Sequence, residues 1–255
     1  MDINTFLGIG FAIFCILLGN HLEGGHAGSL VQLTAFMIVI GGTIGAVIVS
    51  LPSADLHALK LGAKNAFRNK KHDPEEVIQK LVEFAGIARR DGVLALEQRL
   101  GEIEDPFMKQ GLSYLVDGVD LSVARDAMET EIHTEFEETT AGGKIFEAAG
   151  AFAPTIGVLG AVLGLIHVMS NLSNPDAIGP GIAVAFVATV YGVGFANLVF
   201  LPMGAKIKRK AAKERDRKTL IAEGLLSIQE GLNPRVLENK LRAYAGLPPS
   251  EGKEA

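Results

Sequence analysis

The feature of this sequence that most restricts its fold is a set of four long apolar segments. They cover residues 3–19, 31–51, 148–169 and 179–205, and none contains an Asp, Glu, Lys or Arg. A helix needs about 17–25 mostly apolar residues to cross a bilayer. Because backbone polar groups inside lipid must be satisfied within the structure, such segments are expected to be helices. The sequence therefore predicts an all-α, polytopic membrane protein with four transmembrane helices.

The first apolar segment has the position of a secretory signal peptide, which is the alternative to a retained span. No basic residue precedes it, no A-x-A cleavage site follows it, and a second apolar segment begins soon afterwards. A signal peptide has both a basic region before its apolar segment and such a cleavage site after it. Their absence favours a span that stays in the protein.

The basic residues predict the orientation of the spans. All 24 Lys and Arg residues lie within residues 60–144 or 206–253, and none lies in the short links 20–30 and 171–178. Basic residues near membrane spans are retained on the cytoplasmic side. We therefore expect the two short links to face outward and both the N- and C-termini to be cytoplasmic.

This layout divides the chain into four regions. They are transmembrane helices 1 and 2, a cytoplasmic helical domain, transmembrane helices 3 and 4, and a cytoplasmic C-terminal helix with its tail: residues 1–52, 53–147, 148–205 and 206–255. Both later spans are expected to continue as long helices beyond the membrane, because no proline interrupts residues 121–153 and helical spacing of apolar residues continues past Pro202.

The cytoplasmic domain carries clear helix boundaries. Residues 53–72 show apolar residues at helical spacing. A second helix is expected to begin with Asp73 as N-cap and Pro74 at the first helical position, and to end at Gly92. Two shorter helical stretches follow before residue 121.

Composition excludes several classes of protein. The chain has 255 residues, of which 48% are hydrophobic, a net charge of −5 and a single cysteine, Cys15. One cysteine excludes a disulfide framework. The charge and the lack of a basic, aromatic-interleaved patch argue against nucleic-acid binding. No catalytic triad or metal-ligand set can be assembled, so we expect neither an enzyme nor a cofactor or metal site.

The absence of charge inside the spans restricts ion transport. The nearest ionisable groups are Glu147, at the inner edge of the third span, and His167, near its outer end. Transport of protons or cations through a membrane normally needs an ionisable group that faces a cavity. Either the chain transports nothing, or a partner chain supplies the carboxylate.

Small residues form matched stripes on the third and fourth spans. Their spacing follows one face of each helix, at Gly157, Ala161 and Gly164 and at Ala185, Thr189, Gly192 and Ala196. Such stripes let helices approach closely in lipid. One interpretation is ordinary packing of a helical bundle, with Thr155 and Thr189 bonded back to their own helices. The other is a smooth, narrow bore around another helix, beside two prolines, Pro154 and Pro202, that each remove a backbone donor.

Several longer phrases carry a resemblance to a known family. They are "FMIVIGGTIGAVIVSLP", "ARRDGVLALE", "EDPFMKQGLSYLVDG", "APTIGVLGAVLGLIHVM", "AIGPGIAVAFVATVYGVGFANLVFLP" and "EGLLSIQEGLNPRVLENKL". Together they make nearly the whole chain resemble the MotA/PomA subunits of the bacterial flagellar stator, which are distant relatives of ExbB and TolQ. Those relatives have three spans, so the extra first span favours the stator family.

The resemblance implies a ring-forming subunit of the bacterial inner membrane. In this family a homopentamer surrounds two membrane helices of a MotB-type partner, whose aspartate carries the ion, and ion flow is coupled to torque on the rotor protein FliG. The implied ion pathway comprises Pro154, Thr155, Gly157, Ala161, Gly164, Thr189 and Pro202. The implied rotor-facing residues are Arg89, Arg90 and Glu97; without the resemblance they are simply solvated surface charges.

Ion choice depends on the position seven residues after Pro154. Sodium-driven members of the family carry a threonine there, and this chain has Ala161, while Thr189 still matches the family pattern. The loss of one oxygen ligand favours protons, with sodium as the alternative ion. Two alternative functions stay open: a proton-driven energiser of an envelope-spanning partner, like ExbB and TolQ, and a structural membrane scaffold without ion flux.

Overall fold

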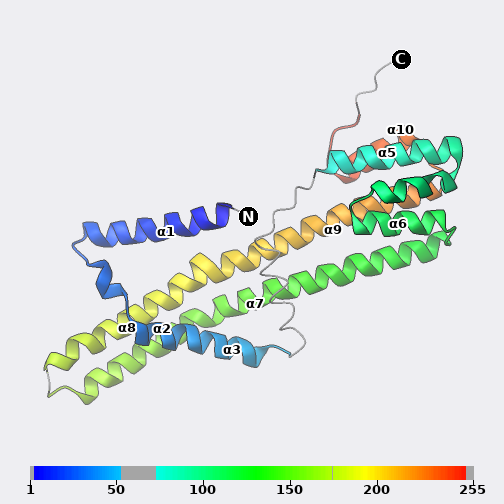
Figure 1. Ribbon diagram of the computed structural model, residues 1–255. Coiled ribbons are helices and arrows are strands. Elements are labelled where there is room, and N and C mark those ends of the chain that lie inside the picture. Colours follow the sequence, from blue (N-terminus) through cyan, green and yellow to red (C-terminus); the bar gives the residue numbers. More distant parts are fainter. Residues whose placement is uncertain (1–2, 53–72, 174, 251–255) are drawn as a thin grey trace. The chain divides into compact units, whose positions relative to one another are not determined.

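The computed structural model describes residues 3–52, 73–173 and 175–250, which fold entirely into helices and their connections (Figure 1). In this described part, four helices are long and apolar enough to cross a membrane: Thr5–Leu22, Ala27–Ser50, Leu121–Ser170 and Ile178–Gln229. The predictions of an all-α fold and of four spans are therefore confirmed. The helix predicted over residues 53–72 lies outside the described residues.

The chain divides into two compact units. One, the apolar unit, comprises Met1–Asn69 and Glu138–Lys210, and the other, the charged unit, comprises Lys70–Glu137 and Ala211–Ala255. Two helices belong to both units, because each continues without a break from one into the other. They are α7 (Leu121–Ser170) and α9 (Leu201–Gln229). The expectation that the third and fourth spans continue as long helices is confirmed.

The apolar unit contains the four candidate spans. The first is α1 (Ile3–Leu22). The second starts with a 3₁₀ turn, has two extended residues at Val31 and Gln32, and is then helical without a break from Leu33 to Ser50, with a π-helical centre. The fourth span also has a π-helical segment, directly before α9. The remaining elements of this unit are η1 (Ala27–Leu30), α2 (Leu33–Phe36), η2 (Met37–Gly41), α3 (Gly42–Ser50), α8 (Pro175–Phe195) and η5 (Ala196–Phe200). Figure 1 shows α8 alongside the C-terminal half of α7.

One tyrosine attaches the link between the first two spans to the fourth span. The Tyr191 hydroxyl on α8 donates to the Leu30 carbonyl oxygen at 2.6 Å and accepts from the Gln32 N–H at 3.2 Å. Its ring packs edge-on against Phe36 of α2 and Phe195 of α8. These contacts hold the start of the second span against α8 within the apolar unit.

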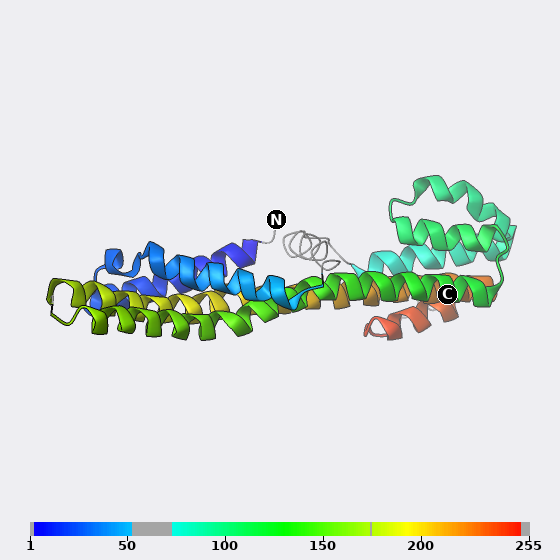
Figure 2. The same ribbon diagram turned by 90° about the horizontal axis from the view of Figure 1, so that it is seen from below.

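The charged unit begins with the predicted helix signals. Helix α5 (Pro74–Asp91) starts where the Asp73 carboxylate accepts the Glu75 N–H at 3.0 Å, and it ends at Gly92, whose φ of 85° favours glycine. The predicted N-cap and C-terminal glycine are thus confirmed. The 3₁₀ helix η4 (Val93–Glu102), α6 (Pro106–Val116) and α10 (Pro234–Tyr244) complete the unit. Figure 2 shows η4 and α6 beside one another.

Large aliphatic residues fill the core of the charged unit. Five leucines with no exposed surface come from five different helices: Leu81, Leu96, Leu112, Leu225 and Leu237. Burying a leucine side chain contributes about 1.5–3 kcal/mol relative to leaving it in water. This shared core holds α5, η4, α6, α9 and α10 together.

Candidate functional site

Glycines recur every seven residues along α7 in the apolar unit. They are Gly143, Gly150, Gly157 and Gly164. Residues seven apart lie on nearly the same face of an α-helix, with a drift of about 20° per repeat. All four face α8, or the part of α9 that belongs to this unit, and a Cβ atom on any of them would lie 2.6–3.0 Å from the nearest atom of that helix. We call these four glycines and their contacts the glycine seam.

The centre of the seam is a contact of backbone on backbone. A Cβ atom placed on Gly157 would lie 2.9 Å from the Ala188 carbonyl oxygen and 3.1 Å from the Cα of Gly192. On Gly192 it would lie 2.6 Å from the Ala153 carbonyl oxygen. Real Cβ atoms do not come this close to backbone atoms, so both positions require glycine.

The end of the seam nearest the C-terminus of α7 repeats the same geometry. A Cβ atom on Gly164 would lie 2.9 Å from the Ala185 nitrogen and 2.9 Å from the Gly181 carbonyl oxygen. Gly157 and Gly164 are therefore buried between two helices of one chain. This packing explains why they are small, and their place in an ion pathway stays a prediction.

Both threonines of the predicted ion pathway bond to their own helices. The Thr155 hydroxyl donates to the Phe152 carbonyl oxygen at 2.8 Å, and the Thr189 hydroxyl donates to the Ala185 carbonyl oxygen at 3.3 Å. Thr155 is exposed and Thr189 is half-buried. A hydroxyl bonded in this way keeps its oxygen lone pairs available to another group.

Two residues of the predicted pathway lie along one edge of the seam. Pro154 and Ala161 each follow a seam glycine by four residues, so they point about 40° away from it around the helix. Both are half-buried, unlike the seam glycines. They therefore have free surface on α7 next to the contact with α8.

Pro202 lies at the point where the fourth span changes its helical geometry. It is the second residue of α9 and directly follows the π-helical segment η5. Proline has no N–H to donate, and single π turns accommodate such breaks and are frequent at functional sites. The Pro202 side chain is exposed. The prolines of the two spans are thus both built into continuous helices.

The predicted rotor-facing residues form an exposed corner of the charged unit. Arg89 and Arg90 are in the last turn of α5, Glu97 is in η4, and Gly92 separates the two helices. All three side chains are exposed, and within the described residues none makes a hydrogen bond or ion pair. Their charges are available to an outside surface.

The neighbouring Arg99 differs from these three residues. Its guanidinium contacts Glu102 at 2.8 Å and Glu83 at 3.4 Å. These interactions, chiefly the hydrogen bond that Arg99 donates to the Glu102 carboxylate, raise the pKa of Arg99. Because Arg99 is already neutralised within the chain, it is a poorer candidate for contact with a partner than Arg89 or Arg90.

One cation is buried and another is half-buried inside the charged unit. Lys218 on α9 contacts Glu131 at 2.8 Å and Glu135 at 2.6 Å, and its ammonium lies 4.5 Å from the centre of the Phe107 ring. Burial lowers the pKa of Lys218, but the hydrogen bonds and charges of the two glutamates outweigh it and raise that pKa. Arg217 pairs similarly with Asp105 and Glu214. These pairs join α6, α7 and α9.

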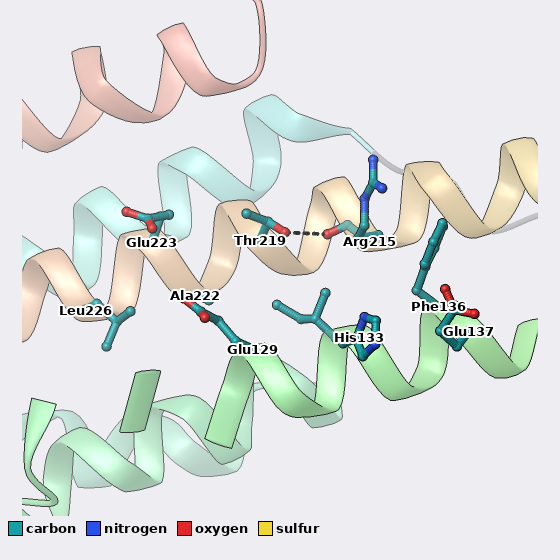
Figure 3. Close-up of a pocket in the computed structure, with 10 residues that line it drawn as sticks. Glu129, His133, Phe136, Glu137, Arg215, Thr219, Ala222, Glu223 and Leu226 are labelled. Carbon is teal, nitrogen blue, oxygen red and sulfur yellow. Dashed lines mark hydrogen bonds between the residues drawn. The ribbon is translucent and has the colours of Figure 1, made fainter. Parts of the chain in front are cut away.

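A pocket of about 340 Å³ lies between α7 and α9 in the charged unit. Figure 3 shows Phe136 beside Arg215, whose guanidinium carbon is 4.8 Å from the ring centre. The other polar side chains of the lining are Glu129, His133, Glu137, Thr219 and Glu223. Within the described residues no group of three His, Cys, Asp or Glu has the geometry to hold a metal ion. None of the predicted site residues lies in this pocket.

The residues that the sequence analysis missed belong to the seam. Gly143 and Gly150 continue the seven-residue repeat, and that period is visible in the sequence. Gly204 is less visible, because its role depends on a contact with Gly143 on another helix. The ion pair between Glu147 and Lys208 is also missing from the prediction, since 61 residues separate the partners.

The fold and the site together define a class of protein. Four apolar helices, a seam of glycines between the third and fourth, and a second, charged unit describe a multi-pass membrane protein with a folded polar unit. The sequence matches the MotA/TolQ/ExbB proton channel family over residues 99–219 and the motility protein A N-terminal family over residues 6–92.

Relatives of known function cover the same length. The chain is 38% identical over 257 residues to the chemotaxis protein PomA of Vibrio alginolyticus, covering 100% of this chain and 98% of the relative. It is 38% identical over 245 residues to motility protein A of Bacillus subtilis, with 96% and 91% covered. The chain therefore belongs to the MotA/TolQ/ExbB proton channel family, as a flagellar stator subunit of the MotA/PomA type. Members are channel and stator proteins, not enzymes.

Solved structures agree with this family. A structure of C. jejuni MotAB matches with a TM-score of 0.90 at 35% identity, covering 100% of this chain and 99% of that one. The flagellar MotAB stator complex from Bacillus subtilis matches with a TM-score of 0.87 at 38% identity, covering 96% of each chain. The stator fold predicted from the resemblance is thus confirmed.

Proposed function

We propose that this stator subunit works with a MotB-type partner to couple proton flow across the bacterial inner membrane to torque on the flagellar rotor. The observation that carries the proposal is the lack of any Asp, Glu, Lys or Arg in the four apolar segments of a chain that belongs to an ion channel family. The ion-carrying carboxylate then comes from the partner. The two similar solved structures, both of MotAB, support this division of labour.

The proposed ion pathway runs between the partner's helices and the third and fourth spans. Pro154, Thr155, Ala161 and Thr189 face the partner, and Thr155 and Ala161 leave free surface for it. Gly157 and Gly164 do not contact the ion. They are buried between α7 and α8 and let these two helices pack closely into a thin, smooth wall. Pro202 lies at the inner end of this wall.

The proposed cycle is electrostatic. A proton from outside neutralises the partner's aspartate, and a neutral carboxyl moves along an apolar wall far more easily than a charged one, which must lose its hydration. Release of the proton to the cytoplasm restores the charge and favours a new position against the next subunit. Five copies of the chain form the ring that steps around the partner.

The energy of one proton is sufficient for a directed step. An elementary charge that crosses 100 mV releases about 2.3 kcal/mol. This is about four times RT, so the reverse step is suppressed by roughly fifty-fold, since every 1.4 kcal/mol is a factor of ten.

The charged unit transmits the motion in this proposal. Arg89, Arg90 and Glu97 are exposed and lack partners among the described residues, so they meet charges on the rotor protein FliG. Both chain termini are on the cytoplasmic side, because the two short links carry no basic residue and therefore face outward.

Protons are the proposed ion because of Ala161. A dehydrated sodium ion needs several oxygen ligands, as hard cations do, whereas a proton needs only a carboxylate and a water path. The alternative of an ExbB/TolQ-like energiser is disfavoured by the match of residues 6–92 to the motility protein A N-terminal family.

The test is swimming in a strain that lacks its own stator subunits. The chain is expressed with the MotB-type product of the adjacent gene, and swimming speed is measured while external sodium and the proton gradient are varied separately. We expect a protonophore to stop swimming and sodium to have no effect. Speed that follows sodium and survives a protonophore contradicts the choice of ion, and no swimming in any condition contradicts the stator function.

A further inference from the structure

One ion pair in the apolar unit lies between two helices that are brought together by glycines. Glu147 of α7 forms a salt bridge with Lys208 of α9, and both side chains are a little over one-third exposed. Each follows a glycine of its own helix by four residues, Glu147 after Gly143 and Lys208 after Gly204. The pair therefore lies at the inner end of the glycine seam.

The two glycines and the two charged stems fit together reciprocally. A Cβ atom on Gly204 would lie 2.9 Å from the Cγ of Glu147, and one on Gly143 would lie 3.0 Å from the Cγ of Lys208. Each stem thus crosses the glycine of the facing helix. This packing holds the Glu147 carboxylate in one position beside α9.

Glu147 also continues the edge of the seam that carries the predicted ion pathway. It precedes Pro154 by seven residues, and Pro154 precedes Ala161 by seven, so the three lie on one face of α7. On this face, Glu147 is the carboxylate that lies next to the uncharged span, on its cytoplasmic side.

A second polar group lies one further repeat along the same face. Thr140 precedes Glu147 by seven residues, is 8% exposed, and its hydroxyl has no hydrogen-bond partner in the described part of the chain. A buried hydroxyl without a partner costs free energy and is a position where water enters to bridge polar groups. Glu147 and Thr140 therefore place two polar groups on one face of α7, on the cytoplasmic side of the wall formed by α7 and α8.

We propose that Glu147 is the proton-transfer residue at the inner end of the ion pathway, which rests on the proposed function of proton transport. The carboxylate of Glu147 accepts the proton that leaves the partner's carboxyl, directly or through a water molecule. The O–H bond of the donor breaks and one forms on Glu147, which becomes neutral and releases Lys208. The proton then passes to water on the Thr140 side, and the carboxylate pairs with Lys208 again.

Basic residues accompany Glu147 on both of the helices that meet there. Lys208 faces it from α9, and Lys144 precedes it by three residues on α7. Lys206 of α9 contacts Thr5 of α1. An ion pair that only ties α7 to α9 is the competing explanation, and the experiment separates the two.

The experiment measures proton flux in vesicles that contain the chain with its MotB-type partner, divided by the amount of complex recovered. Glu147→Gln keeps the shape and a hydrogen bond to Lys208 but removes the site for the proton, so we expect flux to fall at least about tenfold with normal assembly. Lys208→Gln leaves the carboxylate in place and is expected to retain most of the flux. Glu138→Gln, an exposed acid on the same helix, is the matched control.

The double variant E147Q/K208Q covers the case in which E147Q alone fails to assemble. Its two amides bond to one another and keep the contact between α7 and α9 without a carboxylate, and flux per complex again at least about tenfold below wild type supports the proposal. Flux within about twofold of wild type in either E147Q or the double variant overturns it, since such a change is below 0.5 kcal/mol. The wild-type flux itself reports on the proposed function, and the ratio of variant to wild type reports on Glu147.

Discussion

The two units of this protein place their residues in opposite ways. In the charged unit, large side chains such as Leu81, Leu112 and Leu225 are buried. In the apolar unit, the fully buried positions include Ala35, Ala153 and Ala188 besides the larger Val39 and Ile207, and many large residues cover the outside; Phe11 is 69% exposed and Phe186 is 70% exposed.

The difference reflects the solvent that each unit meets. Water drives large apolar groups into a core, at about 25 cal/mol for each Å² buried. Lipid gives no such drive, so helices associate through close backbone contact, and small residues occupy the contacts. The glycine seam therefore holds the helices of the apolar unit together, as the leucine core does in the charged unit. The seam is sensitive to added side-chain atoms, and the core is sensitive to their removal.

The largest effect is expected from Gly157→Leu. Even a Cβ atom at this position would lie 2.9 Å from a backbone oxygen of α8, so α7 and α8 must separate. We expect loss of the assembled complex and of swimming, measured by co-purification with the partner and by motility. Gly194 of α8 has nothing within 4 Å of a Cβ position, so Gly194→Leu provides the control. Equal loss in both variants would show that the seam is not the cause.

Reversal of the free surface charges comes next. The double change Arg89→Glu and Glu97→Arg alters exposed groups without partners in the described residues, so folding is expected to be unaffected. We expect swimming to be largely lost while the amount of complex in the membrane stays the same. Normal swimming by the double variant places rotor contact elsewhere. The same reversal at Arg215 and Asp216, which pair with one another, controls for surface charge in general.

Leu225→Ala tests the core of the charged unit. Leu225 has no exposed surface, and truncating a fully buried leucine costs about 2–5 kcal/mol. Leu159→Ala in the apolar unit is the matched variant, because Leu159 is 50% exposed. Thermal unfolding of the solubilised protein should drop clearly for the first and little for the second. Similar drops in both would contradict the difference between the units.

Lys218→Met tests the buried ion pairs. The change leaves Glu131 and Glu135 without their cation, and because both carboxylates are partly exposed the expected cost is about 2 kcal/mol. The folded pKa of Lys218 is raised above its ordinary value of 10.5, so its contribution is fully present below pH 10.5 and declines as pH rises through the folded pKa. The difference in melting temperature between wild type and variant should be constant from pH 7 to 9 and shrink only in stronger alkali. A difference that already shrinks below pH 9 contradicts this assignment.

The smallest effect is expected from Ala161→Thr. Ala161 lies half-buried at the edge of the seam, where one added hydroxyl fits against free surface. A single oxygen does not complete a sodium site, because the partner's helix also lines the pathway. Swimming speed should remain independent of external sodium, and a speed that begins to follow sodium would show that this position alone selects the ion.

Much of the fold could be predicted because its signals are local. The four spans follow from apolar length, and the limits of α5 follow from Asp73, Pro74 and Gly92. Helix α10 carries the same signal, since Asn233 caps it before Pro234. In contrast, the glycine seam can be predicted only if it is known which helices face each other. The sequence shows that Gly157 is small, but it does not show that Gly157 contacts the backbone of another helix.

The candidate site was predicted less completely than the fold. Arg89, Arg90 and Glu97 are exposed, and their role as rotor-facing residues stays a prediction. The Glu147–Lys208 pair joins residues far apart in the sequence, and no local pattern identifies it. Its position becomes meaningful only when Gly143 and Gly204 are seen to bring α7 and α9 together.

The most direct measurement is proton flux into sealed vesicles that contain this chain alone, the chain with its MotB-type partner, or the chain with a partner whose ion-carrying aspartate is replaced by asparagine. Because the spans of this chain hold no carboxylate, we predict flux only with the unaltered partner. Proton flux through the chain alone, or undiminished flux with the asparagine variant, would contradict the division of labour between the two proteins.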